Sequence, residues 1–324
     1  MPAPATATRT AAPAAVQPPR MTLAAIRRGR IEAPVRTLLF GVEGIGKTTF
    51  GASAPNSIFI GAEDGAGTLD LARFPQPQSW EDIREAIRTL TKDAHGYETL
   101  VLDTIDWAEP LAWRFICNRD NKKDIEDYGY GKGYTAALDE WRVLIADLER
   151  LRAARKMQVV LLAHSWIKSF KNPEGDDFDR YEMKINAKAA GLLKEWCDVV
   201  LFANHETFAV KEGNKRVKGV STGARVCYTT RTAAYDAKNR FSLSEQFPLD
   251  WDEYAAALSS GQTSDPLALA EEIRRKAAEL GGDTEQKAIA LLGQHLGDAS
   301  MLARINNKLN VRLAEKAAAA EVAS

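Results

Sequence analysis

Short runs of apolar residues alternate with longer amphipathic stretches over most of this chain. Four of the runs are uninterrupted, at residues 38–40, 58–60, 100–102 and 159–162. An uninterrupted apolar run of this length is typical of a strand that is buried on both faces. Residues 80–90 and 134–155 instead place apolar side chains at helical spacing. Strands that alternate with helices predict an α/β fold with a doubly wound, mostly parallel sheet.

The last part of the chain has a different pattern. A polar stretch at residues 256–265 predicts a linker, and three helical stretches follow at 266–280, 284–296 and 298–316. Their apolar positions predict a small C-terminal helical domain with one common core. Both ends of the chain are rich in Ala and predict disorder. The expected parts are therefore an N-terminal arm (1–20), a main domain (21–255), a linker (256–265), a helical domain (266–316) and a disordered tail (317–324).

The composition is that of an ordinary globular protein, with 45% hydrophobic and 27% charged residues among 324. The sequence contains no apolar run of about 18 residues and no signal-peptide core, so no membrane segment is expected. The three cysteines, Cys117, Cys197 and Cys227, share no metal or redox spacing, which predicts reduced thiols in the cytoplasm. Because the net charge is −1, any affinity for nucleic acid must come from local patches.

A glycine-rich motif directly follows the first apolar run in RTLLFGVEGIGKTTF. It fits G-x-x-x-x-G-K-[ST], the phosphate-binding P-loop, in full; the alternative is a glycine-rich turn that matches by chance. Glycines let successive backbone N–H groups turn inward around an anion. Lys47 is expected to reach the β- and γ-phosphates of ATP, and the Thr48 hydroxyl to hold Mg²⁺. The predicted ATP-binding residues are Gly41, Val42, Glu43, Gly44, Ile45, Gly46, Lys47, Thr48 and Thr49.

A P-loop ATPase also needs a carboxylate that holds the metal from the end of a buried strand. Asp103 ends the apolar run of YETLVLDTID and is the predicted metal ligand beside Thr48. Thr104 and Asp106 are weaker candidates for the same shell. The alternative for Asp103 is a cap on the following helix.

Two further strand ends carry polar residues that suit ATP hydrolysis. Glu63 follows the run at 58–60, where a carboxylate can polarise the attacking water. His164 follows the run at 159–162, at the edge where open α/β sheets bind ligands, and is predicted to sense the γ-phosphate. The alternatives are a solvated acidic turn at Glu63 and a purely structural role for His164.

Together these motifs resemble the core of the RecA and RadA recombinases. FIGAEDG is similar to the family's strand with the catalytic glutamate, LVLDTID to its Walker B strand, and LLAHS to its sensor strand, with His164 in place of the usual Gln. AKNRFS is similar to the KNRFG box of RadA, with Ser242 in place of the last glycine. The order of the motifs, with the insert DYGYGKGYTAALDEW after Walker B, resembles phage RecA-like annealing proteins of the Sak type. The resemblance covers residues 21–255 and implies a RecA-like ATPase core with Glu63 as the catalytic base.

The same resemblance gives a role to the cations of YDAKNRFSLS. In RecA-like filaments, cations of this strand reach the nucleotide of a neighbouring subunit. Lys238 and Arg240 are therefore predicted to act in trans on the γ-phosphate, since alternate residues of a strand share a face. Asn239 is expected to face the other way and brace the loop. The alternative is an exposed strand edge whose charges block aggregation.

Two regions combine aromatic and basic residues in the manner of single-strand binders, in which rings stack on bases and cations contact phosphates. The first lies between Trp107 and Trp141. The second is the segment after His164, predicted as a surface loop around the Asn-Pro-Glu-Gly turn at 172–175. A separate hairpin with its turn at 212–215 is predicted around VKEGNKRVKG. The predicted DNA-binding residues are Arg119, Lys122, Lys123, Tyr128, Tyr130, Lys132, Tyr134, Trp166, Lys168 and Lys171.

These features predict an ATP-dependent recombination protein of phage type, active in the host cytoplasm, that binds single-stranded DNA and promotes annealing or strand exchange. Its expected cofactors are ATP and Mg²⁺. Its expected partners are single-stranded DNA, further copies of itself in a filament or ring, and a single-strand-binding or replication protein. Two alternatives stay open: a P-loop motor or loader that acts on a protein or replication complex, and a nucleotide switch that barely hydrolyses ATP.

Overall fold

The computed structural model of the chain describes residue 26, residues 33–63, 69–173, 175–212, 216–262 and 266–296, and nine positions between 301 and 316. The expected N-terminal arm (1–20) and tail (317–324) lie outside the described residues. The chain divides into two units, Met1–Ala33 and Pro34–Ser324, and the architecture below is that of the second.

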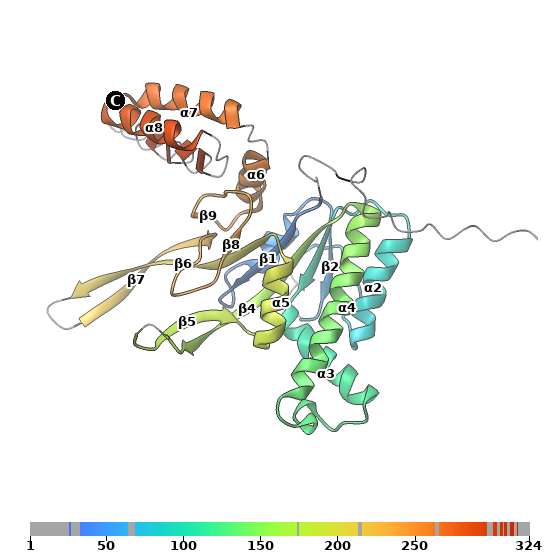
Figure 1. The fold of residues 1–324 in the computed structure, drawn as a ribbon. Helices are drawn as coiled ribbons and strands as arrows, with labels where there is room; N and C mark the ends of the chain where they lie inside the picture. Colours follow the sequence, from blue (N-terminus) through green and yellow to red (C-terminus); the bar gives the residue numbers. More distant parts are fainter. Residues whose placement is uncertain are drawn as a thin grey trace, which may run out of the picture. The chain divides into compact units, whose positions relative to one another are not determined.

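A nine-stranded sheet forms the centre of this unit (Figure 1). Its main path runs β2-β3-β4-β1-β6-β7-β9, while β5 pairs with β4 and β8 pairs with β6. The first five strands of the path are parallel to one another, and β5, β7, β8 and β9 pair antiparallel. The strands are β1 (Arg36–Gly41), β2 (Ser57–Gly61), β3 (Thr99–Asp103), β4 (Gln158–Phe170), β5 (Phe178–Met183), β6 (Val199–Glu212), β7 (Arg216–Tyr228), β8 (Lys238–Asn239) and β9 (Gln246–Pro248).

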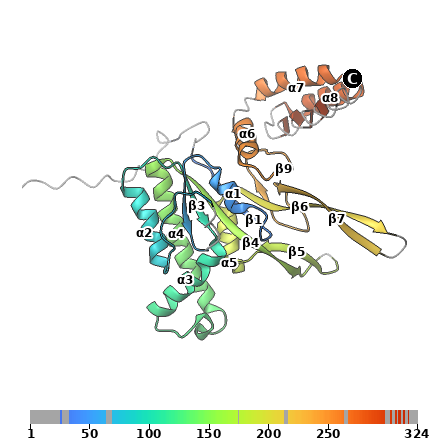
Figure 2. The same cartoon turned by 180° about the vertical axis from the view of Figure 1, so that it is seen from behind.

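Helices cover both faces of the sheet, which confirms the predicted α/β class. Alternate strand residues face opposite sides, so Leu38 and Phe40 pack with α2, α3, α4 and α5, while Leu39 packs with α1 and α6. Helix α5 lies in front of the strands in Figure 1, and α1 lies in front in Figure 2, the view from behind. The helices are α1 (Lys47–Ala52), α2 (Trp80–Lys92), α3 (Ile105–Arg119), α4 (Lys132–Arg155), α5 (Ala187–Trp196), α6 (Trp251–Gln262), α7 (Pro266–Leu280) and α8 (Gly282–His295), with a 3₁₀ turn η2 (Ile125–Tyr128).

The two predicted amphipathic helices, α2 and α4, pack against each other through buried tryptophans. The rings of Trp80 and Trp141 meet edge to face at 5.1 Å, and neither is more than 1% exposed. Such a pair contributes about 0.5–1.5 kcal/mol beyond its buried area. The Ser79 hydroxyl accepts from the backbone N–H of Asp82, whose carboxylate accepts from the N–H of Ser79, so a capping box fixes the start of α2.

The segment after His164 is a strand as far as Phe170, so the prediction of a loop is wrong there, whereas Asn172 and Pro173 of the predicted turn do lie between β4 and β5. Strand β4 continues to Phe170 and pairs antiparallel with β5, from Ser165 opposite Met183 to Phe170 opposite Phe178. The sequence did not indicate this strand, because most of its side chains are exposed and it lacks the run of buried apolar residues found in the first half of β4. The predicted hairpin of β6 and β7 is confirmed, and its turn residues 213–215 lie outside the described residues.

Helix α6 extends through residue 262, so helix occupies most of the stretch predicted as a linker. The Asp250 carboxylate accepts from the N–H groups of Asp252 and Glu253 and caps its start. Trp251, Tyr254 and Leu258 share one helical face and are buried in the core cluster on the α1 side of the sheet. The helical spacing of these apolar residues therefore makes the segment a helix, although the polar residues that follow had suggested a linker.

The C-terminal helices bury apolar residues among themselves, as the sequence predicts. Helices α7 and α8 agree with the expected stretches 266–280 and 284–296, and the described residues of the third stretch are helical. Ile273, Ala277, Leu292, Leu302 and Ile305 belong to one buried cluster. Across the parts of the chain that the structure describes, no helix has the length and apolar character that a membrane span requires.

The hydroxyl of Tyr254 connects α6 to β1. It lies 2.6 Å from the Thr37 hydroxyl, and both side chains are at most 1% exposed. We expect Tyr254→Phe to lower the free energy of unfolding by about 1–3 kcal/mol, because Thr37 loses its buried partner. Urea denaturation measures this change.

The double variant Tyr254→Phe with Thr37→Val removes both hydroxyls and is expected to recover part of the loss. Tyr97→Phe, at a side chain that is 36% exposed, is the matched control and should change stability by less than about 0.5 kcal/mol. A single Tyr254→Phe variant as stable as the wild type would contradict a stabilising hydrogen bond between Tyr254 and Thr37.

Candidate nucleotide site

The P-loop connects the end of β1 to the start of α1 and has the backbone its sequence predicts. Gly46, at the last position before α1, has φ +107°, a conformation that other residues rarely adopt. Gly41 lies against β6, where an added Cβ would come within 2.3 Å of the Ala203 carbonyl oxygen. The remaining predicted ATP-binding residues, Val42, Glu43, Gly44, Ile45 and Thr49, complete the loop and the first turn of α1.

Lys47 is buried at the base of this loop. Its Nζ donates to the carbonyl oxygens of Val42, at 3.0 Å, and of Gly41, at 3.4 Å. Burial lowers the pKa of Lys47, an effect that nearby carboxylates, Asp103 foremost, oppose. The ammonium group is thus held inside the loop by two carbonyls that phosphate oxygens can replace.

Thr48 and Asp103 meet across the edge of the sheet. The Thr48 hydroxyl donates to Asp103 Oδ2 at 2.7 Å. Burial raises the pKa of Asp103, and the hydrogen bond from Thr48 only partly offsets this effect. A buried carboxylate beside a hydroxyl is an oxygen pair of the kind that Mg²⁺ binds, and a divalent cation would stabilise the ionised form. The donor set therefore fits the predicted metal.

His164 lies between two carboxylates. Its backbone N–H donates to Asp106 Oδ1 and its ring Nδ1 to Asp106 Oδ2, both at 2.9 Å. Its other ring nitrogen, Nε2, is 3.8 Å from Glu63 Oε2. Burial acts to raise the pKa of Asp106, but the hydrogen bonds to His164 outweigh burial and lower it below its ordinary value. The structure thus brings Glu63 and His164 together, and it uses Asp106 to orient the imidazole.

Glu109, which the sequence did not single out, lies one helical turn beyond Asp106. Both of its carboxylate oxygens accept from the backbone N–H of Asn186, at 3.0 Å, ahead of α5. The residue is 4% exposed, and burial raises its pKa to about 7. A charged residue in the middle of an amphipathic helix gives no sign of this contact, which depends on the distant residue 186.

The predicted trans-acting cations lie at the opposite edge of the sheet from their own P-loop. Strand β8 (Lys238–Asn239) pairs with Val199 and Val200 at the start of β6, whereas the P-loop follows Gly41 at the end of β1. Because β1 and β6 are parallel, these are opposite ends. Neither Lys238 nor Arg240 is therefore placed to reach the nucleotide site of its own chain.

Lys238 is half-buried and contacts the end of helix α5. Its Nζ donates to the carbonyl oxygens of Lys194, Glu195 and Cys197, at 2.6–2.9 Å. These carbonyls belong to the last turn, where a helix lacks intrahelical donors. Burial lowers the pKa of Lys238, and the nearby charge of Arg240 acts in the same direction.

Arg240 and Asn239 have separate contacts. Arg240 pairs with Asp198 at 3.1 Å, and its side chain is 52% exposed. The Asn239 side chain accepts from the N–H groups of Phe241 and Leu243 and donates to the Leu243 carbonyl. Asn239 thus holds the loop after β8 in the manner predicted.

The first predicted DNA-binding region is a short 3₁₀ turn followed by α4, and much of it is internally bonded. The Tyr128 hydroxyl donates to Asp120 and to the Ile116 carbonyl, and the Tyr134 hydroxyl donates to Glu126. Tyr130, by contrast, is fully exposed. Of the predicted cations, Arg119 is bound to Asp120 and Glu140, Lys122 lies near Asp127, and Lys123 and Lys132 are exposed.

The second region is the outer part of the β4–β5 hairpin. Trp166 is 46% exposed, and the Lys168 ammonium lies 6.0 Å from the centre of its ring. Lys168 is also 4.0 Å from Glu182, and Lys171 pairs with Asp177. The predicted aromatic and basic residues are thus at the surface, with carboxylates beside both lysines.

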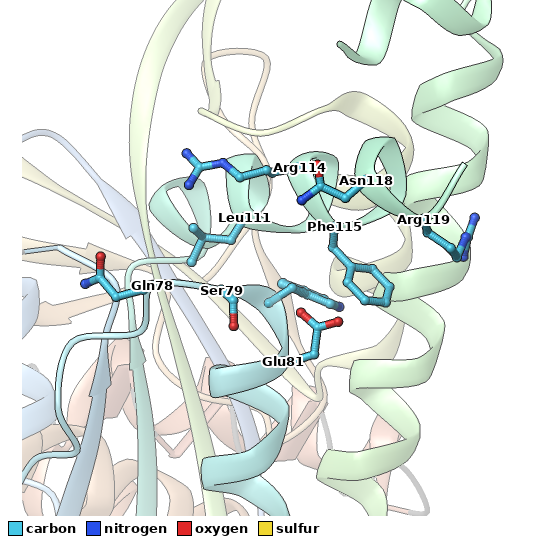
Figure 3. A pocket seen from close by; sticks show the side chains of 9 residues that line it. Gln78, Ser79, Glu81, Leu111, Arg114, Phe115, Asn118 and Arg119 are labelled. Atoms are coloured by element: carbon cyan, nitrogen blue, oxygen red, sulfur yellow. The ribbon is translucent and has the colours of Figure 1, made fainter. Parts of the chain in front are cut away.

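A hollow of about 360 Å³ lies between the start of α2 and α3. Figure 3 shows Arg114, Phe115 and Asn118 of α3 together with Ser79 and Glu81 at the start of α2. None of the P-loop residues lines this hollow, which is therefore separate from the nucleotide site.

Comparison with known proteins gives a family match over most of the described core. The family model described as an AAA domain matches residues 33–241, a span that contains every residue of the site described above. The SPbeta prophage-derived uncharacterized protein YorG of Bacillus subtilis (strain 168) is 26% identical over 107 residues, 32% of this chain and 33% of the relative. The match therefore spans about a third of that relative's length. The crystal structure of the RadB recombinase is similar with a TM-score of 0.34 and 16% identity, over 60% of this chain and 80% of that one.

The raised pKa of Glu109 predicts a pH dependence of stability. Because the folded state holds the Glu109 proton up to about pH 7 and the unfolded state releases it near its ordinary value, stability falls as pH rises through this interval. Glu109→Gln keeps an acceptor for Asn186 and removes the ionisation. We expect the variant to gain roughly 2–3 kcal/mol over the wild type between pH 5 and pH 8, measured by urea denaturation.

Glu85→Gln, on the exposed side of α2, is the control, and its curve should run parallel to that of the wild type. A constant difference between Glu109→Gln and the wild type over this pH range would refute the assignment.

Proposed function

The chain belongs to the AAA domain family of P-loop ATPases, and from this premise we propose that it hydrolyses Mg²⁺-bound ATP as an oligomer on single-stranded DNA. In this proposal the protein promotes annealing or strand exchange, in the cytoplasm of a host cell. A prophage-derived relative supports the phage setting. The resemblance of four motifs to RecA and RadA supports recombination over a motor or loader role.

One observation carries the ATPase part of the proposal. Thr48 of the P-loop contacts Asp103 at the end of β3, and Glu63 and His164 approach each other after β2 and within β4. The four side chains come from neighbouring strand ends and from the loop beside them. The groups proposed to bind phosphate, bind the metal and accept a proton therefore lie at one edge of the sheet, where open α/β sheets bind ligands.

The chemistry follows from these positions. Lys47 leaves its two carbonyls to bind the β- and γ-phosphates, while the P-loop N–H groups surround the phosphate chain. Thr48 and Asp103 would hold Mg²⁺, which would neutralise charge on the phosphate oxygens. Glu63 orients the attacking water and accepts its proton. His164, whose ring is held by Asp106, has its Nε2 3.8 Å from Glu63 Oε2 and so limits the positions that the Glu63 carboxylate can take.

The proposed DNA contacts lie on two surfaces. Trp166 and Lys168 present a ring and a cation on the β4–β5 hairpin, and Tyr130 presents an exposed ring before α4. Stacking rings and phosphate-binding cations are the combination that single-strand binders use. The neighbouring carboxylates weaken this contact, because lysines that already pair with a carboxylate neutralise fewer phosphates.

The proposed subunit interface places Arg240 at the nucleotide of the next copy. Its side chain is 52% exposed, and among the described residues its ion-pair partner is Asp198, which stays paired with Arg36 if Arg240 turns away; both facts support this role. Lys238 can join it only by giving up three carbonyl contacts. Among the two cations, Arg240 is therefore the stronger candidate.

Lys47→Ala tests the site. We expect ATP turnover to fall roughly a hundredfold or more, because the charge that binds the transferring phosphate is lost. In the unaltered protein, a single-stranded oligonucleotide at low salt should bind and raise turnover several-fold. A coupled phosphate-release assay measures both effects.

Lys92→Ala, on the exposed end of α2, is the control and should leave turnover unchanged. Normal turnover in Lys47→Ala would overturn the ATPase assignment. Absence of oligonucleotide binding at low salt would overturn the DNA part and leave the ATPase part standing.

Arg240→Ala tests action in trans. We expect it to bind ATP normally and to lose most of its turnover. Mixed in equal amounts with Lys47→Ala, it should regain about a quarter of wild-type turnover, since that share of head-to-tail interfaces joins an intact P-loop to an intact Arg240. Arg142→Ala, an exposed arginine of α4 paired with Asp139, is the control and should keep full turnover. No recovery on mixing would refute the trans role.

A further inference from the structure

A second arginine lies beside the P-loop, and it belongs to the same chain. Arg225 is in β7, opposite His205 of β6, and 180 residues from the loop it contacts. Its guanidinium Nη1 donates to the Ile45 carbonyl oxygen at 3.4 Å. The N–H of Leu249 in turn donates to the Arg225 carbonyl at 2.9 Å, which fixes the backbone at this point.

The guanidinium fills the space that the missing side chain of Gly46 leaves. A Cβ at Gly46 would lie 2.6 Å from Arg225 Nη1 and 3.6 Å from its central carbon. The positive φ is what requires glycine at Gly46, because the flexible Arg225 side chain could move away from an added Cβ. The cation is thus in contact with the residue directly before Lys47.

Arg225 also differs from many arginines of this chain in its partners. Arg36 and Arg180, for example, are bound to carboxylates. Within the described part of the chain, no carboxylate lies within ion-pair distance of Arg225. One long bond to a carbonyl uses one of its five N–H donors, and the residue is exposed. The remaining donors and the full charge are available to an anionic ligand.

We propose that Arg225 is a nucleotide-binding residue supplied in cis, whose guanidinium contacts the phosphate chain of the ATP held by its own P-loop. This inference rests on the proposed ATPase function and adds a residue to the same site. Guanidinium groups bind phosphate oxygens through two parallel N–H donors, which lysine cannot do. Arg225 approaches the loop from the β7 side, whereas Asp103 and Glu63 approach from β3 and β2. The phosphates are then bound from both sides of the loop.

A simple structural brace is the competing role for Arg225. A brace requires only a donor that reaches the Ile45 carbonyl. A glutamine is too short to reach it, so loss of a brace would lower the melting temperature, whereas loss of a phosphate contact would not. Phosphate binding requires the positive charge, which a lysine keeps in part. The melting temperature of Arg225→Gln and the ATP affinity of Arg225→Lys therefore separate the roles.

The test measures the affinities of ATP, ADP and adenosine by calorimetry, together with the melting temperature of the protein without nucleotide. We expect Arg225→Gln to weaken ATP and ADP binding about tenfold or more, with adenosine affinity and melting temperature unchanged. Arg225→Lys should lose less affinity for ATP and ADP than Arg225→Gln. Arg231→Gln, an exposed arginine paired with Asp236, is the control and should match the wild type.

Mixing separates this cis role from the trans role of Arg240. Equal amounts of Arg225→Gln and Lys47→Ala should show no recovered turnover, because each intact P-loop stays in a chain without Arg225. Recovery would overturn the cis assignment, and so would unchanged ATP affinity in Arg225→Gln or an equal loss for adenosine. If Lys47→Ala also binds ATP like the wild type, the P-loop site itself is refuted and the inference with it.

Discussion

The register of the parallel strands is the constraint on which the site depends. Gly61 of β2 lies opposite Asp103 of β3, which lies opposite Leu162 of β4. Glu63 and His164 are each two residues beyond these positions, so they reach the same height above the sheet. This common height explains why a carboxylate and an imidazole from strands on either side of β3 approach within 3.8 Å. A slip of one residue would turn alternate side chains to the other face and separate the two groups.

The sequence was sufficient for features that depend on local chemistry. The P-loop follows from glycines and a lysine at fixed spacing, and the buried strands follow from uninterrupted apolar runs. The contact between Thr48 and Asp103 followed from combining the two. Asn239 was also placed correctly, because an asparagine after a strand commonly bonds to the backbone of the next residues.

Contacts between segments far apart in the chain could not be predicted from local sequence patterns. Arg225 contacts Ile45 across 180 residues, and Glu109 accepts from Asn186 across 77. The outer half of β4 was missed for another reason. Its side chains are exposed, so the strand is stabilised by backbone pairing with β5 and carries no buried run that the sequence could show.

At the end of the sheet where β1 and β6 begin, charged residues of the same chain form ion pairs with one another. Asp198 pairs with Arg36 as well as with Arg240, so Asp198 keeps a partner if Arg240 turns toward another subunit. The helix end that Lys238 caps has no such second donor among the described contacts. If two copies associate, Arg240 can therefore turn toward the neighbouring subunit at a small cost in free energy, whereas Lys238 stays bound to helix α5 of its own subunit.

The docking of α6 has a practical consequence for anyone who dissects the protein. A fragment that ended at residue 255 would cut this helix within its apolar face and lose Leu258 from the core. A fragment that keeps this core cluster intact therefore reaches at least Leu258, and shorter truncations would expose apolar surface and favour aggregation.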